Sequence, residues 1–217
     1  MSYLKVTNVC VELKRKTIVR NVNVNGELGQ VLGFVGENGS GKTILFKAIC
    51  GFVKIKSGEI QVGEERIGED VDFPSNTGIL IENPGFIPSM TGFDNLYSLA
   101  LLMKGVSKKD ILNLLDLVGL IDNKDIKFSK YSLGMKQRLG IAQALMGDPN
   151  LVILDEPFNG LDNQGIELLI ELILQLKKEN KLVLLTSHRN EDLEKVCDKF
   201  YKVQEGNFSV ITGEWNE

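Results

Sequence analysis

A glycine-rich loop at residues 36–43 constrains the fold of this chain more than any other segment. Its sequence, GENGSGKT, follows an apolar run that predicts a buried strand, and it precedes a helix expected over residues 42–50. Glycines allow successive backbone N–H groups to turn inward around a phosphate, and a helix N-terminus attracts the same negative charge. In such a loop Lys42 reaches the β- and γ-phosphates, and the Thr43 hydroxyl is a ligand for Mg²⁺. We therefore expect a nucleotide to be bound by Gly36, Glu37, Asn38, Gly39, Ser40, Gly41, Lys42, Thr43 and Ile44.

The composition limits the class of protein. A chain of 217 residues, 43% of them apolar, can form one large domain or one domain with an inserted lobe. Its 25 basic and 29 acidic residues give a net charge of −4, which does not favour nucleic acid as the main partner. No apolar run approaches the length of a membrane span, and the N-terminus is not signal-like, so any role at a membrane is expected to depend on a partner chain.

The cysteines indicate a reducing compartment. Cys10, Cys50 and Cys197 are odd in number, far apart in the sequence and set among apolar residues. This spacing predicts buried thiols and not a metal site or a disulfide framework.

Short apolar runs predict a parallel sheet in an α/β core. The runs at residues 151–154 and 182–186 are almost entirely apolar, as is typical of parallel strands covered on both faces. A mostly buried helix expected over residues 166–178 lies between them, so strand, helix and strand predict a right-handed crossover. Looser alternation near the N-terminus indicates a separate antiparallel region. Core strands are expected at residues 31–35, 79–81, 151–154 and 182–186, and antiparallel strands at residues 4–13, 17–25 and 58–62.

The middle of the chain is expected to be helical. Thr91 and Ser107 are each followed three residues later by an acidic residue, Asp94 and Asp110, which is the pattern of a helix N-terminus. Ser132 is a third start signal, and apolar residues at helical spacing follow each of the three.

These segments together predict the fold class. We expect an α/β fold of the P-loop NTPase type, with an antiparallel β subdomain near the N-terminus and an inserted helical subdomain. The predicted boundaries place the nucleotide-binding core at residues 1–83 and 148–217, and the helical subdomain at residues 84–147.

Two carboxylates follow a predicted buried strand. Asp155 and Glu156 come directly after residues 151–154, and the ends of strands in open parallel sheets face the ligand crevice. Asp155 can hold Mg²⁺ directly or through water, and Glu156 can polarise a water for attack on the γ-phosphate. An ordinary acidic loop would show the same pair, but the phosphate-binding loop upstream favours the catalytic interpretation.

With these motifs in view, nearly the whole chain resembles the nucleotide-binding subunit of an ABC transporter. Five further segments occur in the order typical of that family. Leu133 and Met135 depart from the Gly and Gln usual in its signature segment, whereas Ser132 and Gly134 match. The five are YSLGMKQR at residues 131–138, NGLD at residues 159–162, TSH at residues 186–188, IEN at residues 81–83, and Leu13, which stands where an aromatic residue usually stacks on adenine.

The resemblance implies roles for residues that the spacing alone leaves open. Ser132 caps the helix that follows it, so its hydroxyl and the helix N-terminus present donors to an anion. In the family that anion is the γ-phosphate held by a second copy, packed head-to-tail, and Gly134 and Asp162 belong to the same shared site. A plain capped helix remains the alternative for Ser132. His188, the one histidine, would contact the γ-phosphate and join Glu156 and Lys42 as a catalytic residue, although a lone histidine is more often structural.

Two positions outside the signature segment also depart from the family pattern. Glu82 replaces a glutamine near Mg²⁺ and the attacking water; it supplies a charge, and it is either a metal ligand or a change without consequence. With the residues that follow it, Glu82 resembles the bacitracin- and lantibiotic-resistance branch of exporters. Leu13 can cover a base face but lacks the stacking of an aromatic, so base selectivity is expected to be loose.

The function implied is ATP- and Mg²⁺-dependent. A dimer of two copies would hydrolyse ATP and drive a separate membrane-spanning permease, with export of a peptide antibiotic or lipid-like compound as the expected transport. The chain would then lie at the cytoplasmic face of the membrane through its permease, and would be soluble when isolated, without a nucleic-acid partner.

The alternative is a soluble ABC ATPase in translation or DNA repair, but such chains usually carry two ATPase units or a long coiled coil. A non-hydrolysing switch is disfavoured by Glu156, and a P-loop kinase by the signature segment.

Overall fold

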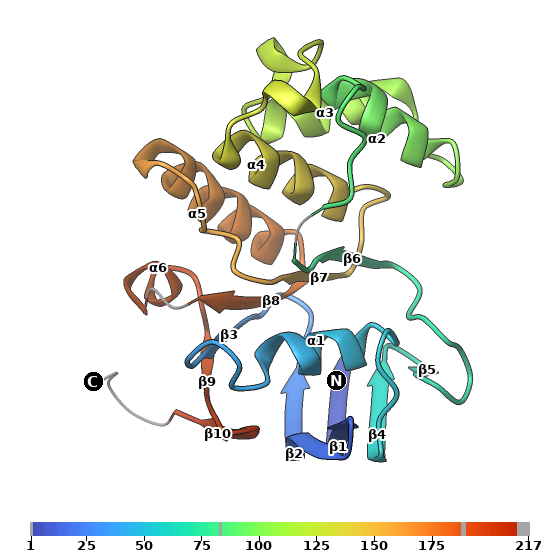
Figure 1. The fold of residues 1–217 in the computed structure, drawn as a ribbon, viewed down its shortest axis with the longest axis vertical. Coiled ribbons are helices and arrows are strands. Elements are labelled where there is room, and N and C mark those ends of the chain that lie inside the picture. Colours follow the sequence, from blue (N-terminus) through green and yellow to red (C-terminus); the bar gives the residue numbers. More distant parts are fainter. Residues whose placement is uncertain (1, 83, 188–189, 212–217) are drawn as a thin grey trace.

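The computed structural model describes residues 2–82, 84–187 and 190–211, which form two sheets and a set of helices (Figure 1). The strands are β1 (Leu4–Leu13), β2 (Lys16–Gly26), β3 (Val31–Val35), β4 (Ser57–Val62), β5 (Glu65–Arg66), β6 (Thr77–Leu80), β7 (Leu151–Leu154), β8 (Leu182–Ser187), β9 (Lys199–Gln204) and β10 (Asn207–Val210). The α-helices are α1 (Lys42–Ile49), α2 (Gly92–Ala100), α3 (Lys108–Leu117), α4 (Leu133–Ala144), α5 (Asn163–Lys178) and α6 (Asn190–Glu194), and short 3₁₀ turns span Ile121–Asn123 and Phe128–Lys130.

The larger sheet is the parallel sheet that the apolar runs predict. Its order is β10-β9-β3-β8-β7-β6, with parallel pairing throughout except for the antiparallel edge strand β10. The N-terminal strands form a separate antiparallel sheet of order β2-β1-β4-β5, as the alternation indicates. Because parallel strands meet with their carboxyl ends at one edge, the segments after β3, β6, β7 and β8 lie close together.

The parallel sheet is buried on both faces, which explains its continuous apolar strands. In β8, Leu182 and Leu184 enter a core shared with α1 and the antiparallel sheet, whereas Val183 and Leu185 enter a core shared with α2–α5. Side chains alternate in this way because successive residues of a strand point to opposite faces. Figure 1 shows α1 between the two sheets, and it shows α2 and α3 at the end of the molecule far from the antiparallel sheet.

The helix start signals lie where the sequence predicts them. The Thr91 hydroxyl accepts the backbone N–H of Asp94 (3.0 Å) at the N-terminus of α2. Ser107 and Asp110 form a capping box at α3, and the Ser132 hydroxyl accepts the N–H of Met135 (3.2 Å) at α4. Since each bond satisfies a donor that the helix itself leaves open, these side chains determine where the helices begin.

Three predictions need correction. The helix α1 ends at Ile49 and not at residue 50, because Cys50 already takes the capping position before Gly51, whose φ is +79°. The helix α5 begins at Asn163, three residues before the predicted start, because the side chain of Asp162 caps it. The strand expected at residues 79–81 is β6, Thr77–Leu80, which ends before the positive φ of Glu82 (60°).

The cysteines are only partly as predicted. All three are free thiols, but Cys10 and Cys197 are half-buried and only Cys50 is buried. Burial raises the pKa of the Cys50 thiol to about 12. The pKa of the Cys10 thiol is lowered, chiefly because its sulfur accepts the backbone N–H of Asn21. Within the described ranges, no helix is both long enough and apolar enough to span a bilayer.

Candidate functional site

The glycine-rich loop connects β3 to α1 in a conformation that requires glycine. A Cβ atom at Gly36 would lie 2.1 Å from the carbonyl oxygen of Val203, so no other residue fits without moving β9. Gly41 has φ +115° and is the N-cap of α1, and it makes no side-chain capping bond there. The first turn of α1 also contains no acidic residue. Its N–H groups are therefore positioned to donate to an anion.

Lys42 folds back over this loop. Its side chain is buried, and its ammonium donates to the carbonyl oxygens of Gly36 (2.6 Å) and Glu37 (3.0 Å). The positive charge is thus held above the loop by backbone oxygens, which a phosphate can replace as the partner of the ammonium.

Asp155 lies at the end of β7, opposite the first turn of α1. The Thr43 hydroxyl donates to Asp155 Oδ2 (2.7 Å), and the hydroxyl of Thr186 in β8 donates to Asp155 Oδ1 (2.6 Å). The Asp155 N–H donates to the carbonyl of Leu80 in β6 (2.8 Å). The first turn of α1 and the strand β8 therefore both bond to the carboxylate of Asp155, and β6 holds its backbone.

Glu156 follows in a left-handed backbone conformation, with φ +51°. Such a conformation costs a non-glycine residue about 1–2 kcal/mol, so surrounding contacts must hold it. The Glu156 N–H donates to the Thr186 hydroxyl (2.7 Å), and the side chain of Gln137 in α4 donates to the Glu156 carbonyl (3.2 Å). The backbone of Glu156 is therefore held by hydrogen bonds at both its N–H and its carbonyl group.

These side chains line one small cavity of about 110 Å³. It collects most of the residues that the sequence nominates for nucleotide and metal binding, and it adds Ile18 of β2, which the sequence does not indicate. The lining residues are Ile18, Asn38, Gly39, Gly41, Lys42, Thr43, Ile44, Asp155 and Glu156.

The structure places Leu13 and Glu82 outside the lining of this cavity, as it does Gly36, Glu37 and Ser40 of the loop itself. Leu13 is half-buried at the end of β1 and packs against the core shared with α1, outside the lining of the cavity. Glu82 also lies outside that lining, where its carboxylate pairs with the ammonium of Lys47 in α1 (2.6 Å) and is 65% exposed. His188 lies outside the described residues.

The comparison with known proteins decides the family. A family model described as ABC transporter matches residues 19–159, well over half of the chain. The uncharacterised ABC transporter ATP-binding protein YybJ of Bacillus subtilis is 37% identical over 207 residues, which are 95% of this chain and 95% of that protein. The chain belongs to the ABC transporter family. It is the ATP-binding subunit of such a transporter, in a family that hydrolyses ATP to power transport.

Other relatives agree with the ABC assignment and with the branch that the sequence resembles. The lantibiotic transport ATP-binding protein SrtF of Streptococcus pyogenes is 39% identical, covering 94% of this chain and 87% of that protein. The bacitracin transport ATP-binding protein BcrA of Enterococcus faecalis is 37% identical, covering 94% and 67%. A solved ATP-binding subunit of an ABC transporter superposes with a TM-score of 0.85 at 26% identity, covering 97% of this chain and 90% of that chain. The predicted family and fold class are confirmed.

The segment that resembles the ABC signature is held by contacts within the chain. Gly134, in the first turn of α4, packs so closely on the loop before α5 that a Cβ would lie 2.9 Å from the carbonyl oxygen of Gly160. Asp162 of the same loop accepts the N–H of Gly165 (2.9 Å) and caps α5. The three residues predicted for a shared site, Ser132, Gly134 and Asp162, therefore belong to two adjoining helix N-termini.

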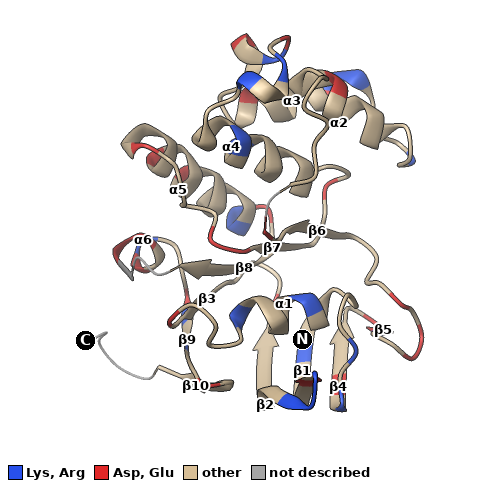
Figure 2. Ribbon diagram, in the orientation of Figure 1, with Lys and Arg blue, Asp and Glu red and all other residues tan. Residues whose placement is uncertain are grey.

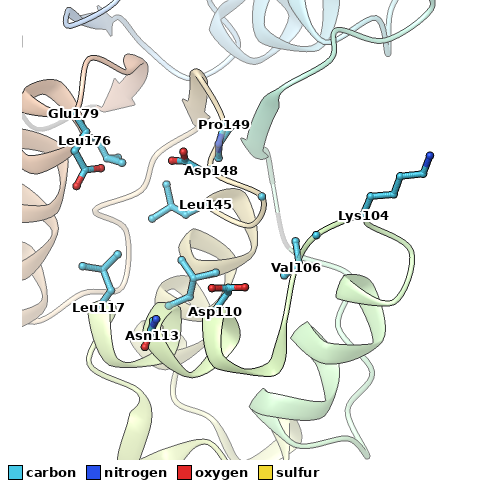
Figure 3. A pocket seen from close by; sticks show the side chains of 13 residues that line it. Lys104, Val106, Asp110, Asn113, Leu117, Leu145, Asp148, Pro149, Leu176 and Glu179 are labelled. Carbon is cyan, nitrogen blue, oxygen red and sulfur yellow. The ribbon is translucent and has the colours of Figure 1, made fainter.

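A larger cavity of about 670 Å³ lies apart from the nucleotide cavity of the ABC subunit (Figure 3). Figure 3 shows side chains from α3, from the turn before β7 and from the end of α5 around it, among them Asp110, Asp148 and Glu179. It shares no residue with the nucleotide cavity, so we assign it no part in hydrolysis.

Proposed function

We propose that this ABC subunit hydrolyses Mg²⁺-bound ATP in a head-to-tail dimer and thereby drives export of a peptide antibiotic or lipid-like compound. The convergence of Thr43, Asp155 and Glu156 on the cavity beside the glycine-rich loop carries the hydrolytic part of the proposal. The dimer, the metal and the exported compound are the proposed steps beyond family membership.

The proposed catalytic residues act from the positions described. Lys42 exchanges the carbonyls of Gly36 and Glu37 for the β- and γ-phosphates, which keeps its ammonium hydrogen-bonded before and after binding. Glu156 accepts the proton of the attacking water and orients that water toward the γ-phosphate. His188 is assigned contact with the γ-phosphate from the family resemblance.

The oxygen ligands at the end of β7 suit Mg²⁺. A hydroxyl and a carboxylate are hard donors of the kind that Mg²⁺ takes alongside nucleotide phosphates, and Thr43 and Asp155 bring them within 2.7 Å of each other. Among the described residues no group of three or more His, Cys, Asp and Glu could hold a metal by itself, so phosphate and water would complete the shell. The ion would neutralise charge that develops on the phosphate oxygens.

Glu82 is proposed as a further metal ligand, which requires it to leave Lys47. An exposed ion pair of this kind contributes little, about 0–1 kcal/mol, so metal binding can compete with it. We expect Glu82→Gln to weaken ATP-dependent Mn²⁺ binding roughly tenfold or more, and Lys47→Met to strengthen it. Mn²⁺ electron paramagnetic resonance titrations measure both, with the exposed Glu64→Gln as the control. Unchanged Mn²⁺ affinity in both variants would mean that Glu82 serves only as the partner of Lys47.

The second copy would complete each ATP site through the signature helix. Ser132 lies at the N-terminus of α4, where a helix presents positive partial charge, and its hydroxyl can still donate while it accepts the Met135 N–H. The anion proposed to bind at the N-terminus of α4 in one copy is the γ-phosphate of the ATP held by the other copy. Gly134 and Asp162 support that surface by fixing α4 against the loop before α5.

An apolar groove beside the edge strand β6 is the proposed contact for the membrane-spanning partner. It has a volume of about 520 Å³ and lies among β6, α2 and α4. Phe52 (55% exposed), Leu102 (85%) and Met103 (41%) gather around it, and an exposed apolar patch of this kind commonly marks a surface that another protein covers. Pro84 and Gly85 line the groove next to Glu82, so movement of a helical subdomain at residues 84–147 would reach both the site and the partner. Binding here would place the subunit at the cytoplasmic face of the membrane.

The names of the relatives and the presence of Glu82 support the proposed exported compound. Deleting the gene is expected to raise the sensitivity of its host to bacitracin or to a lantibiotic several-fold, because the relatives transport these peptides. Minimal inhibitory concentrations measure the change, and the wild-type gene must restore resistance whereas a Glu156→Gln copy must not. Equal sensitivity of the deletion strain to both peptides would contradict the proposed export.

The soluble alternative, an ABC ATPase of translation or DNA repair, gains no support. Figure 2 shows acidic as well as basic residues along the ribbon, and the net charge of −4 does not favour nucleic acid as a partner. The named relatives are transport proteins, which favours a membrane-spanning partner over a nucleic-acid partner.

A further inference from the structure

Two buried hydroxyl residues, Thr186 and Ser187, end the otherwise apolar strand β8. The strand reads LVLLTS, and its residue Thr186 is 0% exposed in the middle of the parallel sheet. A buried hydroxyl is costly unless it is hydrogen-bonded, and valine would fill the same space without a polar atom. The residue therefore requires an explanation from its contacts.

Thr186 bonds to both residues of the carboxylate pair at once. Its hydroxyl donates to Asp155 Oδ1 (2.6 Å) and accepts the backbone N–H of Glu156 (2.7 Å). A hydroxyl has one hydrogen to donate, and here Asp155 receives it. The same atom thus links the carboxylate of one residue to the backbone of the next.

Each bond has its own consequence for the site. Asp155 receives hydroxyl groups on both oxygens, from Thr43 on Oδ2 and from Thr186 on Oδ1, so its carboxylate cannot rotate without losing one of them. The bond to Glu156 holds that residue in its left-handed conformation, and the direction of the Glu156 side chain depends on that conformation. The orientation of both acidic side chains therefore depends on one hydroxyl.

We propose that Thr186 is a positioning residue for ATP hydrolysis, which orients Asp155 for the metal and Glu156 for the attacking water through a single hydroxyl. The proposal rests on the proposed function, because it assigns those two roles to Asp155 and Glu156. Thr186 itself touches neither nucleotide nor metal in this role. Hydrogen-bonded residues behind metal ligands commonly determine how well the ligands bind.

The test compares variants that differ by the hydroxyl. Thr186→Val keeps the shape and removes the hydroxyl, whereas Thr186→Ser keeps the hydroxyl. We expect Thr186→Val to lower kcat and ATP-dependent Mn²⁺ affinity roughly 10-fold or more, with little change in the KM for ATP, and Thr186→Ser to remain near wild type. Mn²⁺ electron paramagnetic resonance and steady-state kinetics measure these quantities. Thr7→Val, at an exposed position of β1, is the matched control.

Two further arms make the outcome decisive. If Thr186→Val does not fold, as judged by circular dichroism, Thr186→Ala and Thr186→Ser provide the same comparison, because they differ only in the hydroxyl. Equal Mn²⁺ affinity and kcat with and without the hydroxyl would overturn the positioning role. Asp155→Asn distinguishes a failure of the Thr186 role from a failure of the proposed function. If Asp155→Asn also leaves Mn²⁺ binding unchanged, the assignment of the metal to Asp155 is wrong. If Asp155→Asn weakens Mn²⁺ binding and the Thr186 variants do not, only the role of Thr186 is rejected.

Discussion

Glu156→Gln is expected to lower kcat for ATP hydrolysis by roughly 10²- to 10⁴-fold while nucleotide binding persists. The amide has nearly the shape of the carboxylate but cannot accept a proton from water, so only the chemical step loses its base. The backbone bonds that hold residue 156, from its N–H to Thr186 and from Gln137 to its carbonyl, do not involve the side chain and remain. Steady-state phosphate release measures kcat, and equilibrium dialysis with labelled ATP measures binding.

The same variant also tests the dimer. If hydrolysis opens two closed copies, a subunit that binds but does not hydrolyse ATP accumulates as a dimer, which size-exclusion chromatography with ATP detects. Glu171→Gln, on the exposed side of α5, is the matched control and should hydrolyse ATP at the wild-type rate without accumulating dimer. A Glu156→Gln subunit with wild-type turnover would remove Glu156 from the role of general base.

Local patterns in the sequence predict most of the fold because they report local physics. The alternation of β1, β2 and β4, the continuous apolar runs of β7 and β8, and the caps at Thr91, Ser107 and Ser132 are all confirmed. Each of these features depends on residues that are close in the sequence. Alternation reports which face of a strand is buried, and a cap supplies an acceptor for a backbone N–H that lacks one. The apolar pattern places the start of α5 three residues too late, because Asp162 caps the helix and the periodic apolar residues begin only after that cap.

The remaining site residues come from contacts between distant segments. Gln137 and Thr186 meet Glu156 across 19 and 30 positions of the sequence, and Ile18 reaches the cavity from the antiparallel sheet. Gln137 and Thr186 both lie inside motifs that the sequence shows, at residues 131–138 and 186–188, but neither motif indicates that these two side chains bond to Glu156. The motif also assigned Glu82 to the metal without indicating Lys47, because an ion pair between α1 and the segment after β6 depends on packing that no pattern records.

Lys42→Met is expected to weaken ATP binding about 10- to 150-fold. Methionine has a similar length and can pack in the same buried position, but it loses charge-assisted hydrogen bonds to phosphate, and removal of such bonds costs roughly 1.5–3 kcal/mol. Fluorescence titration with a labelled ATP analogue measures the dissociation constant. Lys5→Met, at an exposed position of β1, is the control and should bind as wild type does.

The structure also predicts how the variant behaves without nucleotide. Gly36 and Glu37 would lose the ammonium that bonds to their carbonyls, so the loop should become less protected in amide hydrogen exchange and the free energy of unfolding should fall by about 1–3 kcal/mol. A pure phosphate-binding role would weaken ATP binding and leave the free protein unchanged. Loss in both measurements is expected here, because the same ammonium bonds to the loop before the phosphates arrive and to the phosphates afterwards. Unweakened ATP binding in Lys42→Met would contradict the assignment of Lys42 to the phosphates.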